Sequence, residues 1–307
     1  MRVLITGATG LIGKHVVSRC KENGIAIHYL TTRKSKLESN ENYKGFYWDP
    51  DSGEIDKSCF DGVDAIIHLA GASISKRWTS AYKKEILDSR VKPTHLLIQS
   101  LIGEKHHVKH VISASAIGVY PDSLVNYYDE TFTDFDHESF LTLVVNKWEE
   151  AVDGFKELGI EVSKIRIGLV LAKEGGALPS MAKPIKFGVG SAFGKGKQWQ
   201  SWIHIHDLSE MFIRVLQDEL YGIYNGVAPN PVTNNDLVLM IAKVLNKPLL
   251  LPNIPEFVMR ILLGEMHVIL YASQRVSSQK IESEGFQFKY HRLEPALEDL
   301  LLKSEDQ

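Results

Sequence analysis

The chain has 307 residues, 44% of them hydrophobic, and a formal net charge of -3 at pH 7, which suits one large α/β core or a domain with a smaller lobe. The near-neutral charge argues against a nucleic-acid-binding surface, and no apolar run approaches the roughly 18 residues that a membrane-spanning helix needs. The two cysteines, Cys20 and Cys59, form neither a CxxC pair nor a zinc-ligand pattern, so we expect the reducing cytoplasm and no bound metal.

Predicted strands and helices alternate along the first half of the chain, which opens on a short apolar strand rather than a signal peptide. The strands are expected at Arg2–Thr6, Ile25–Leu30, Ala65–Ala70, Val108–Ser115 and Glu161–Val170. The helices are expected at Leu11–Glu22, Ser80–Leu101 and Phe140–Leu158. Pro93 should bend or divide the second helix. This alternation predicts an α/β Rossmann fold, a doubly wound parallel sheet with helices on both faces, whose strand carboxyl ends form one ligand crevice.

After residue 171 the pattern changes, because glycine and proline become frequent and indicate loops that cover the crevice. Four more helices are expected near Asp207–Gln217, Asn234–Leu245, Pro255–Leu263 and Arg292–Leu302. Asp207 is the expected N-cap of the first of these. We therefore expect a Rossmann domain over residues 1–171, which also uses part of 200–230, and substrate-side loops with a smaller C-terminal helical lobe over 172–307.

A glycine-rich turn joins the first predicted strand to the first helix, with glycines at intervals of three. Gly7 permits the sharp turn, Gly10 lets the backbone approach a phosphate, and Gly13 lets the helix pack close to the sheet. The amino terminus of the helix adds unpaired N–H groups and a partial positive charge for a pyrophosphate. The residues predicted to bind a dinucleotide here are Thr6, Gly7, Thr9, Gly10, Leu11, Ile12 and Gly13.

The residues after the second predicted strand indicate which dinucleotide is bound. A site that prefers NAD places Asp or Glu there, where the carboxylate accepts hydrogen bonds from the ribose hydroxyls. Here the stretch offers Thr32, Arg33 and Lys34, and no acid. Arg33 can clamp a 2′-phosphate through its planar guanidinium, with Lys34 as a second charge, so the sequence favours NADP(H). The alternative is a solvated pair of surface cations.

Several stretches carry a resemblance to a known family. Thr6–Gly13 is similar to the TGxxGxxG turn of extended and atypical short-chain dehydrogenases, and Ser115 matches their catalytic serine at a strand end. A fourth-strand motif that lies beside the adenine ribose in that family is matched by His68, Leu69, Ala70 and Gly71. Further matches are Arg77-Trp78, Asp88-Ser89-Arg90-Val91, Lys147-Trp148-Glu149, Arg166–Leu171 and Trp202–Leu208. Together the motifs resemble NAD-dependent epimerase/dehydratase-like proteins that have their own carboxyl-terminal domain.

The resemblance implies a catalytic Tyr-x-x-x-Lys pair on the helix after the serine strand, where the lysine also holds the nicotinamide ribose. Lys147 matches the lysine, but Leu143 stands at the tyrosine position, and a leucine cannot transfer a proton. The sequence therefore predicts that any oxidoreduction uses Ser115 and Lys147 together with Tyr120 or water. The alternatives are a strand-end role for Ser115, a packed aromatic at Tyr120 and a solvated position for Lys147.

Two functions from different classes fit the sequence. The first is an NADP(H)-dependent oxidoreductase or epimerase-like enzyme, and the second is a cofactor-binding sensor or regulatory protein without chemistry. Leu143 favours the second, whereas Ser115, Lys147 and the glycine-rich covering loops favour the first. We therefore expect an enzyme with a small-molecule substrate and no nucleic-acid or membrane partner, and both monomer and homodimer stay open.

Overall fold

The structure, a computed structural model, describes residues 1–302 and is built around a nine-stranded sheet. The strand order is β13-β9-β7-β6-β1-β2-β4-β3, and β5 pairs with β4. The strands are β1 (Arg2–Thr6), β2 (Ala26–Thr31), β3 (Ser39–Asn40), β4 (Tyr43–Asp49), β5 (Glu54–Ile55), β6 (Ala65–His68), β7 (His110–Ala116), β9 (Glu161–Ile167) and β13 (Gly222–Gly226). Neighbouring strands pair in parallel, except that β3 and β5 run antiparallel to β4.

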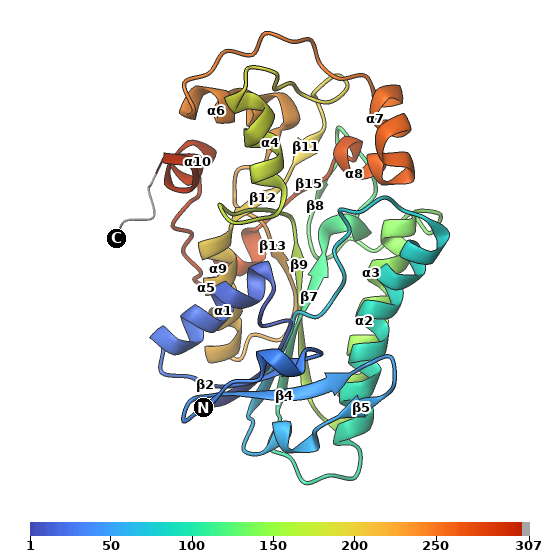
Figure 1. Ribbon diagram of the computed structural model, residues 1–307, viewed down its shortest axis with the longest axis vertical. Coiled ribbons are helices and arrows are strands. Elements are labelled where there is room, and N and C mark those ends of the chain that lie inside the picture. Colours follow the sequence, from blue (N-terminus) through green and yellow to red (C-terminus); the bar gives the residue numbers. More distant parts are fainter. Residues whose placement is uncertain (303–307) are drawn as a thin grey trace.

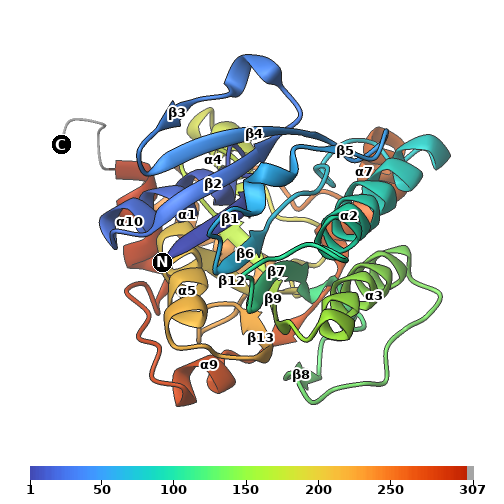
Figure 2. The same cartoon turned by 90° about the horizontal axis from the view of Figure 1, so that it is seen from below.

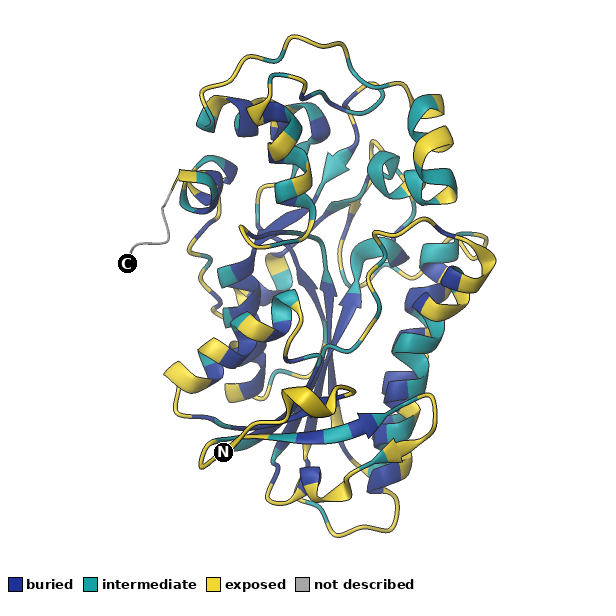
Figure 3. Cartoon of the chain, viewed as in Figure 1, coloured by how far each residue is buried: buried dark blue, intermediate teal, exposed yellow. Residues whose placement is uncertain are grey.

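Helices cover both faces of this sheet. On one face α1 (Leu11–Glu22) packs against α5 (Ile205–Gln217), and on the other α2 (Ser80–Leu101) packs against α3 (Phe140–Asp153) (Figure 1, Figure 2). The central strands are almost entirely buried, whereas the helices carry exposed residues on their outer sides (Figure 3). This arrangement confirms the predicted fold class, a doubly wound parallel sheet of the Rossmann type.

A smaller C-terminal lobe has a hydrophobic core of its own, formed where α4 (Ala177–Lys186), α6 (Asn234–Val244) and α10 (Leu293–Leu302) meet. In α4, Leu178, Ala182 and Ile185 are buried at helical spacing and supply its share of this core. The remaining elements are α7 (Glu256–Leu263), α8 (Val268–Tyr271), α9 (Gln279–Ser283), β8 (Tyr127–Tyr128), β10 (Leu169–Leu171), β11 (Trp199–Gln200), β12 (Trp202–His204), β14 (Val232–Thr233) and β15 (Arg275–Val276). No helix among residues 1–302 is long and apolar enough to cross a membrane.

Three elements differ from the sequence predictions. Residues 43–49 form β4, a parallel strand beside β2 that the hydrophobic pattern did not reveal, because partly exposed residues interrupt its buried positions. α2 is one continuous helix through Pro93, so of the two outcomes predicted, a bend or a division, the division does not occur; the proline ring is buried and the helix packs against α3. Part of the segment expected as covering loops is helical, because α4 packs on α6.

Asp207 does not have the N-cap role predicted from the sequence. The N-cap of α5 is His204, whose Nδ1 accepts a hydrogen bond from the backbone N–H of His206 at 3.0 Å. Asp207 is 1% exposed, and its carboxylate accepts hydrogen bonds from the backbone N–H groups of Lys289 and Tyr290 at 3.0 and 2.9 Å. Asp207 therefore fastens the segment before α10 to the first turn of α5.

The variant Asp207→Ala should lower the free energy of unfolding by about 3 kcal/mol, because two buried backbone donors would lose a charged acceptor. Urea unfolding followed by circular dichroism measures this difference. The control is Asp218→Ala, which removes a more exposed ion pair with Arg214 after the last turn of the same helix. It should change the free energy by less than about 0.5 kcal/mol. Equal losses in the two variants would contradict the role of Asp207.

Candidate active site

The turn between β1 and α1 has a conformation that only glycines allow at two positions. Gly7 has φ +68°, and a Cβ there would lie 2.8 Å from the carbonyl oxygen of Leu69. A Cβ on Gly13 would lie 2.1 Å from the carbonyl oxygen of Gly7. Gly10 is the N-cap of α1 and supplies no capping side chain, so the first N–H groups of the helix stay available to an anion. This cradle fits a dinucleotide pyrophosphate.

The other predicted residues of the turn lie at its surface and under a covering loop. Thr9 is exposed, whereas Leu11 and Ile12 are partly buried. The Leu11 side chain packs beneath the backbone that follows β10, where a Cβ on Gly176 would lie 3.3 Å from Leu11 Cδ2. The glycine-rich segment after β10 therefore comes within contact distance of the pyrophosphate cradle.

Thr6 and His68 lie beneath this turn and are fully buried. Thr6 Oγ1 accepts hydrogen bonds from the backbone N–H groups of Leu69 and Ala70, both at 3.0 Å, so its proton goes to His68 Nδ1 at 2.8 Å. His68 Nε2 then donates to Thr94 Oγ1 at 3.0 Å. Burial lowers the pKa of His68 to about 4, so the ring is neutral. These side chains hold β6 against β1 and place the backbone that follows β6 beside the turn.

A cavity of about 580 Å³ lies beyond the carboxyl ends of β2 and β6. Thr32 lines it from the end of β2, and Ala70 and Gly71 line it from the segment after β6. Glu85 and Ser89 of α2 contribute to the opposite wall. This is the position at which the adenosine half of a dinucleotide lies in a Rossmann fold.

Arg33 is exposed at the start of the 3-10 turn Lys34–Lys36, directly after β2. No carboxylate in the described chain pairs with its guanidinium, which leaves this group available to a phosphate. Lys34 is less free, because its Nζ lies 4.6 Å from the ring centre of Tyr47. The two cations therefore differ, and Arg33 is the better placed for a 2′-phosphate.

Arg90 of α2 is a candidate site residue to which the sequence motifs assign no role. Its guanidinium donates to the carbonyl oxygens of Ile86 and Ala72 at 2.8 and 3.2 Å, and its Cζ lies 5.1 Å from the ring centre of Trp148. Burial lowers the pKa of Arg90 to about 10, and no carboxylate among residues 1–302 pairs with it. A Cβ on Gly71 would lie 3.3 Å from its Cζ. This cation suits an anionic group of a cofactor.

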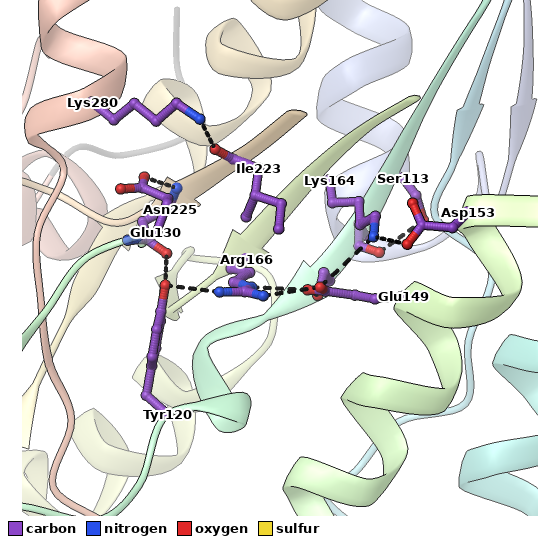
Figure 4. Close-up of polar contacts among 12 residues, drawn as sticks. Ser113, Tyr120, Glu130, Glu149, Asp153, Lys164, Arg166, Ile223, Asn225 and Lys280 are labelled. Carbon is purple, nitrogen blue, oxygen red and sulfur yellow. Dashed lines mark hydrogen bonds and ion pairs between the residues drawn. The ribbon is translucent and has the colours of Figure 1, made fainter. Parts of the chain in front are cut away.

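The predicted catalytic Ser115 belongs to a buried network. Its Oγ donates to Glu149 Oε1 at 2.5 Å, and Arg166 donates to both carboxylate oxygens of Glu149, at 2.9 and 3.0 Å. Arg166 also donates to Tyr120 Oη at 3.1 Å, and this hydroxyl donates to Asn225 at 2.8 Å (Figure 4). All five residues are buried. The hydroxyl protons of Ser115 and Tyr120 are therefore held by partners inside the protein.

The placements of Tyr120 and Lys147 argue against the acid–base roles predicted for them. Burial raises the pKa of Tyr120 to about 12, which makes its hydroxyl a weaker acid than an exposed phenol. The Lys147 side chain is 54% exposed and pairs with Glu150 at 2.8 Å on the outer side of α3. Leu143, one turn earlier, is also exposed. The structure thus agrees with the alternatives of a packed aromatic and a solvated lysine.

The side of α3 that faces the site carries Val144 and Trp148 instead. Both are buried, and both line an apolar cavity of about 210 Å³. The pair has the spacing of Tyr-x-x-x-Lys, displaced by one residue, and one residue turns a helical side chain by roughly 100°. The Trp148 Nε1–H is buried and has no hydrogen-bond partner in the described residues. The hydrophobic spacing along α3, rather than the motif, is the signal that identifies this face.

The small cavity adjoins a larger one of about 780 Å³ between the Rossmann sheet and the C-terminal lobe. The residues that line both are Gly118, Leu141, Ala272 and Gln274. From the lobe, Lys195, Lys197 and Tyr271 line the larger cavity, and Asp122 and Asp136 line it from the segment between β7 and α3. The arrangement therefore has an apolar inner end and a polar outer chamber.

The fold and the position of these cavities define a protein of the short-chain dehydrogenase class. Sequence comparison is more specific. The model of the NAD-dependent epimerase/dehydratase family matches residues 3–225, and a model described as a domain of unknown function, DUF1731, matches residues 254–300. The chain belongs to the NAD-dependent epimerase/dehydratase family, which confirms the resemblance found in the sequence.

Similar proteins match over nearly the whole chain. An epimerase family protein of Staphylococcus aureus (strain MRSA252) is 35% identical over 301 residues, which are 98% of this chain and 99% of the relative. The crystal structure of the human epimerase family protein SDR39U1 (isoform 2) with NADPH is 28% identical, with a TM-score of 0.84 and coverage of 99% and 100%. A nucleoside-diphosphate sugar epimerase from Corynebacterium glutamicum is 28% identical, with a TM-score of 0.78 over 98% of this chain and 58% of the other.

Leu143→Tyr would complete the Tyr-x-x-x-Lys motif in the sequence, yet it should leave NADPH affinity unchanged, because positions 143 and 147 lie on the exposed side of α3. The matched variant Val144→Tyr places the same side chain in the 210 Å³ cavity and should weaken NADPH binding about tenfold by filling it. Titration followed by cofactor fluorescence measures both. A larger effect of Leu143→Tyr would show that the motif register, and not the buried face, is correct.

Ser115→Ala should lower the free energy of unfolding by about 2 kcal/mol, because the Glu149 carboxylate would lose a buried hydrogen bond, and should leave NADPH affinity unchanged. Ser113→Ala on the same strand is the control: its hydroxyl donates to the neutral carbonyl of Ala114 at 2.8 Å, so about 1 kcal/mol is expected. Urea unfolding and NADPH titration give both quantities. Unchanged stability with lost cofactor binding or turnover would favour the catalytic role predicted from the sequence.

Proposed function

We propose that the protein is an NADP(H)-dependent oxidoreductase of the epimerase-like type that acts on a small molecule. The observation that carries this is Arg33, an exposed cation without a carboxylate partner at the end of β2, where a site that prefers NAD has an acid. The human relative, at 28% identity, was solved with NADPH, which supports the same preference here. When bound, NADPH supplies a hydride.

The chain's own groups would hold the cofactor along the carboxyl edge of the sheet. The Gly7–Gly13 turn and the amino terminus of α1 would bind the pyrophosphate, and Arg33 the 2′-phosphate. Arg90 would neutralise a further negative charge beside Gly71. The apolar cavity lined by Val144 and Trp148 would enclose the nicotinamide and exclude water from it.

The expected compartment and partners are also part of the proposal. Cys20 and Cys59 are buried free thiols, which is typical of a reducing compartment such as the cytoplasm. The cavity of about 780 Å³ is of the size that encloses a small molecule, so a small-molecule substrate is proposed rather than a macromolecular one.

A second candidate, a cofactor-binding sensor without chemistry, is favoured by two observations. The hydroxyls of Ser115 and Tyr120 are held in the buried network, and Val144 and Trp148 occupy the face where an acid and a lysine would act. A sensor must distinguish the two redox states, so it would bind NADPH and NADP+ with different affinities and consume neither. The enzyme is preferred because the lobe and the sheet enclose a chamber beside the cofactor cavity.

Arg33→Ala should weaken NADPH binding about tenfold or more and leave NADH binding unchanged, because only NADPH carries the 2′-phosphate that a charge-assisted hydrogen bond would hold. Anaerobic titration with each cofactor, followed by cofactor fluorescence and thermal shift, measures both affinities. The matched control is Lys36→Ala in the same 3-10 turn, which should change neither affinity.

Equal affinities of the unmodified protein for NADPH and NADH would overturn the preference for NADP(H). Absence of binding to either cofactor would overturn the proposed function as a whole. Equal losses in Arg33→Ala and Lys36→Ala would show that the turn acts through its overall charge rather than through a specific phosphate contact.

A further inference from the structure

The described lining of the inner cavity, of about 210 Å³, offers none of the usual general acids, and the guanidinium of its Arg90 donates to the carbonyl oxygens of Ile86 and Ala72. Its described lining holds no Asp, Glu, His, Lys, Tyr or Cys, and Arg90 is its one charged residue. Ser201 is its one hydroxyl residue; this Oγ donates to the carbonyl oxygen of Gln274 at 2.8 Å and accepts from the backbone N–H of Val276 at 2.9 Å. The cavity is therefore apolar and without a general acid.

The hydroxyl groups of nearby Ser115, Tyr120 and Tyr271 donate hydrogen bonds to partners inside the protein. The hydroxyl proton of Ser115 is donated to Glu149, and that of Tyr120 to Asn225. Tyr271, in the outer chamber, donates its hydroxyl proton to the carbonyl oxygen of Ile254 at 3.2 Å. The remaining ionisable residues of the outer chamber, which do not line the inner cavity, are Asp122, Asp136, Lys195, Lys197 and Glu256.

The absence of an acid restricts which hydride acceptor reacts there. Reduction of an isolated carbonyl group forms an alkoxide, a localised and strongly basic charge that is costly in an apolar cavity unless a positioned acid protonates it. A conjugated acceptor avoids this cost. A hydride on the β-carbon of an enal or enone leaves an enolate, whose charge is shared between oxygen and carbon and which water is able to protonate later.

We infer that the substrate is an apolar α,β-unsaturated carbonyl compound, reduced at its carbon–carbon double bond; this inference rests on the proposed function. The β-carbon gains a hydride from NADPH, which leaves as NADP+, and the π electrons move onto the carbonyl as an enolate. Water from the adjoining outer chamber then protonates the α-carbon once the enolate has moved out of the inner cavity, giving the saturated carbonyl compound and hydroxide. The conjugated end lies against the nicotinamide in the inner cavity, where it opens to the outer chamber of about 780 Å³, and that chamber holds the rest of the substrate.

The composition of the inner cavity supports a flat apolar group. Trp148 and Trp199 line it, together with isoleucines from several elements, among them Ile74 after β6 and Ile269 of α8. Arg90, which also lines it, supplies one positive charge near the developing enolate. A sugar ring, which carries many hydroxyls, would find few partners here, because each buried hydroxyl without a hydrogen bond costs binding energy.

The test uses the full chain with NADPH and a matched pair of acceptors, cinnamaldehyde and its saturated analogue dihydrocinnamaldehyde. The expected product of cinnamaldehyde is dihydrocinnamaldehyde, and the saturated aldehyde itself should not be consumed. With NADPH that carries deuterium at the transferable position, the label should appear on the β-carbon. Cyclohexenone as a second conjugated acceptor should likewise give cyclohexanone, and UDP-glucose should give no change.

A binding measurement tests the cavity independently of turnover. Cinnamaldehyde should quench the tryptophan fluorescence of the protein saturated with NADP+, because Trp148 and Trp199 line the inner cavity. Ile269→Thr, which places a hydroxyl in this lining, should weaken the binding of cinnamaldehyde to the NADP+-saturated protein about fivefold. The control is Ile261→Thr on α7, where the side chain is exposed, and it should bind both ligands as the unmodified protein does.

Three results would overturn the inference while leaving the proposed function intact. They are formation of cinnamyl alcohol, consumption of dihydrocinnamaldehyde, and tight NADPH binding without reduction of either conjugated acceptor. The first two would show that the protein delivers a proton to a carbonyl oxygen. Loss of NADPH binding itself is a different result, because it would refute the proposed function and not the choice of acceptor alone.

Discussion

Glu149 and Arg166 form the contact on which the active-site end of the sheet depends. Their two hydrogen bonds join α3 to β9 in the interior, where either charge alone would cost several kcal/mol. Ser115 links β7 to this ion pair, because its hydroxyl donates a hydrogen bond to Glu149. Because Glu149 must face inward to meet Arg166, the rotation of α3 about its axis is set. Val144 and Trp148 consequently lie toward the cavity, and the positions that a motif alignment selects lie toward solvent.

Much of this fold could be predicted from the sequence because its signals are local. The turn at Gly7–Gly13 needs glycine because of its backbone conformation and close contacts, and the spacing of its three glycines is visible in the sequence. The alternation of strands and helices follows from the spacing of hydrophobic residues. Which side of α3 faces the cavity is harder to predict, because a shift of one residue in the sequence rotates a helical side chain by roughly 100°. The contact of Asp207 with Lys289 joins segments far apart in the sequence, so the short-range capping interpretation failed there.

Elsewhere in this class one tyrosine and one lysine combine two tasks, positioning of the cofactor and delivery of a proton. In this site the two tasks are separate. Positioning is retained: the buried threonine–histidine contact at Thr6 and His68 holds the strand ends beneath the cradle, and α3 supplies a wall. Proton delivery by a side chain is not built into the inner cavity. In the proposed reaction the protein would contribute shape, exclusion of water and one cation, Arg90, and the electronic structure of the acceptor would decide whether reaction occurs.

The path of the chain between the two lobes has a consequence for how such proteins can evolve. After β9 the chain runs through α4 in the C-terminal lobe, returns as α5 to pack on α1, and adds β13 beside β9 before entering the lobe again. Later, β15 pairs with β8, and α9 comes back to contact β13. The two lobes are interleaved along the chain. Recombination that replaced the whole C-terminal lobe as one continuous segment would therefore also remove the edge strand β13 and the covering helix α5 from the Rossmann domain. Substitutions and changes of loop length leave this interleaved path intact.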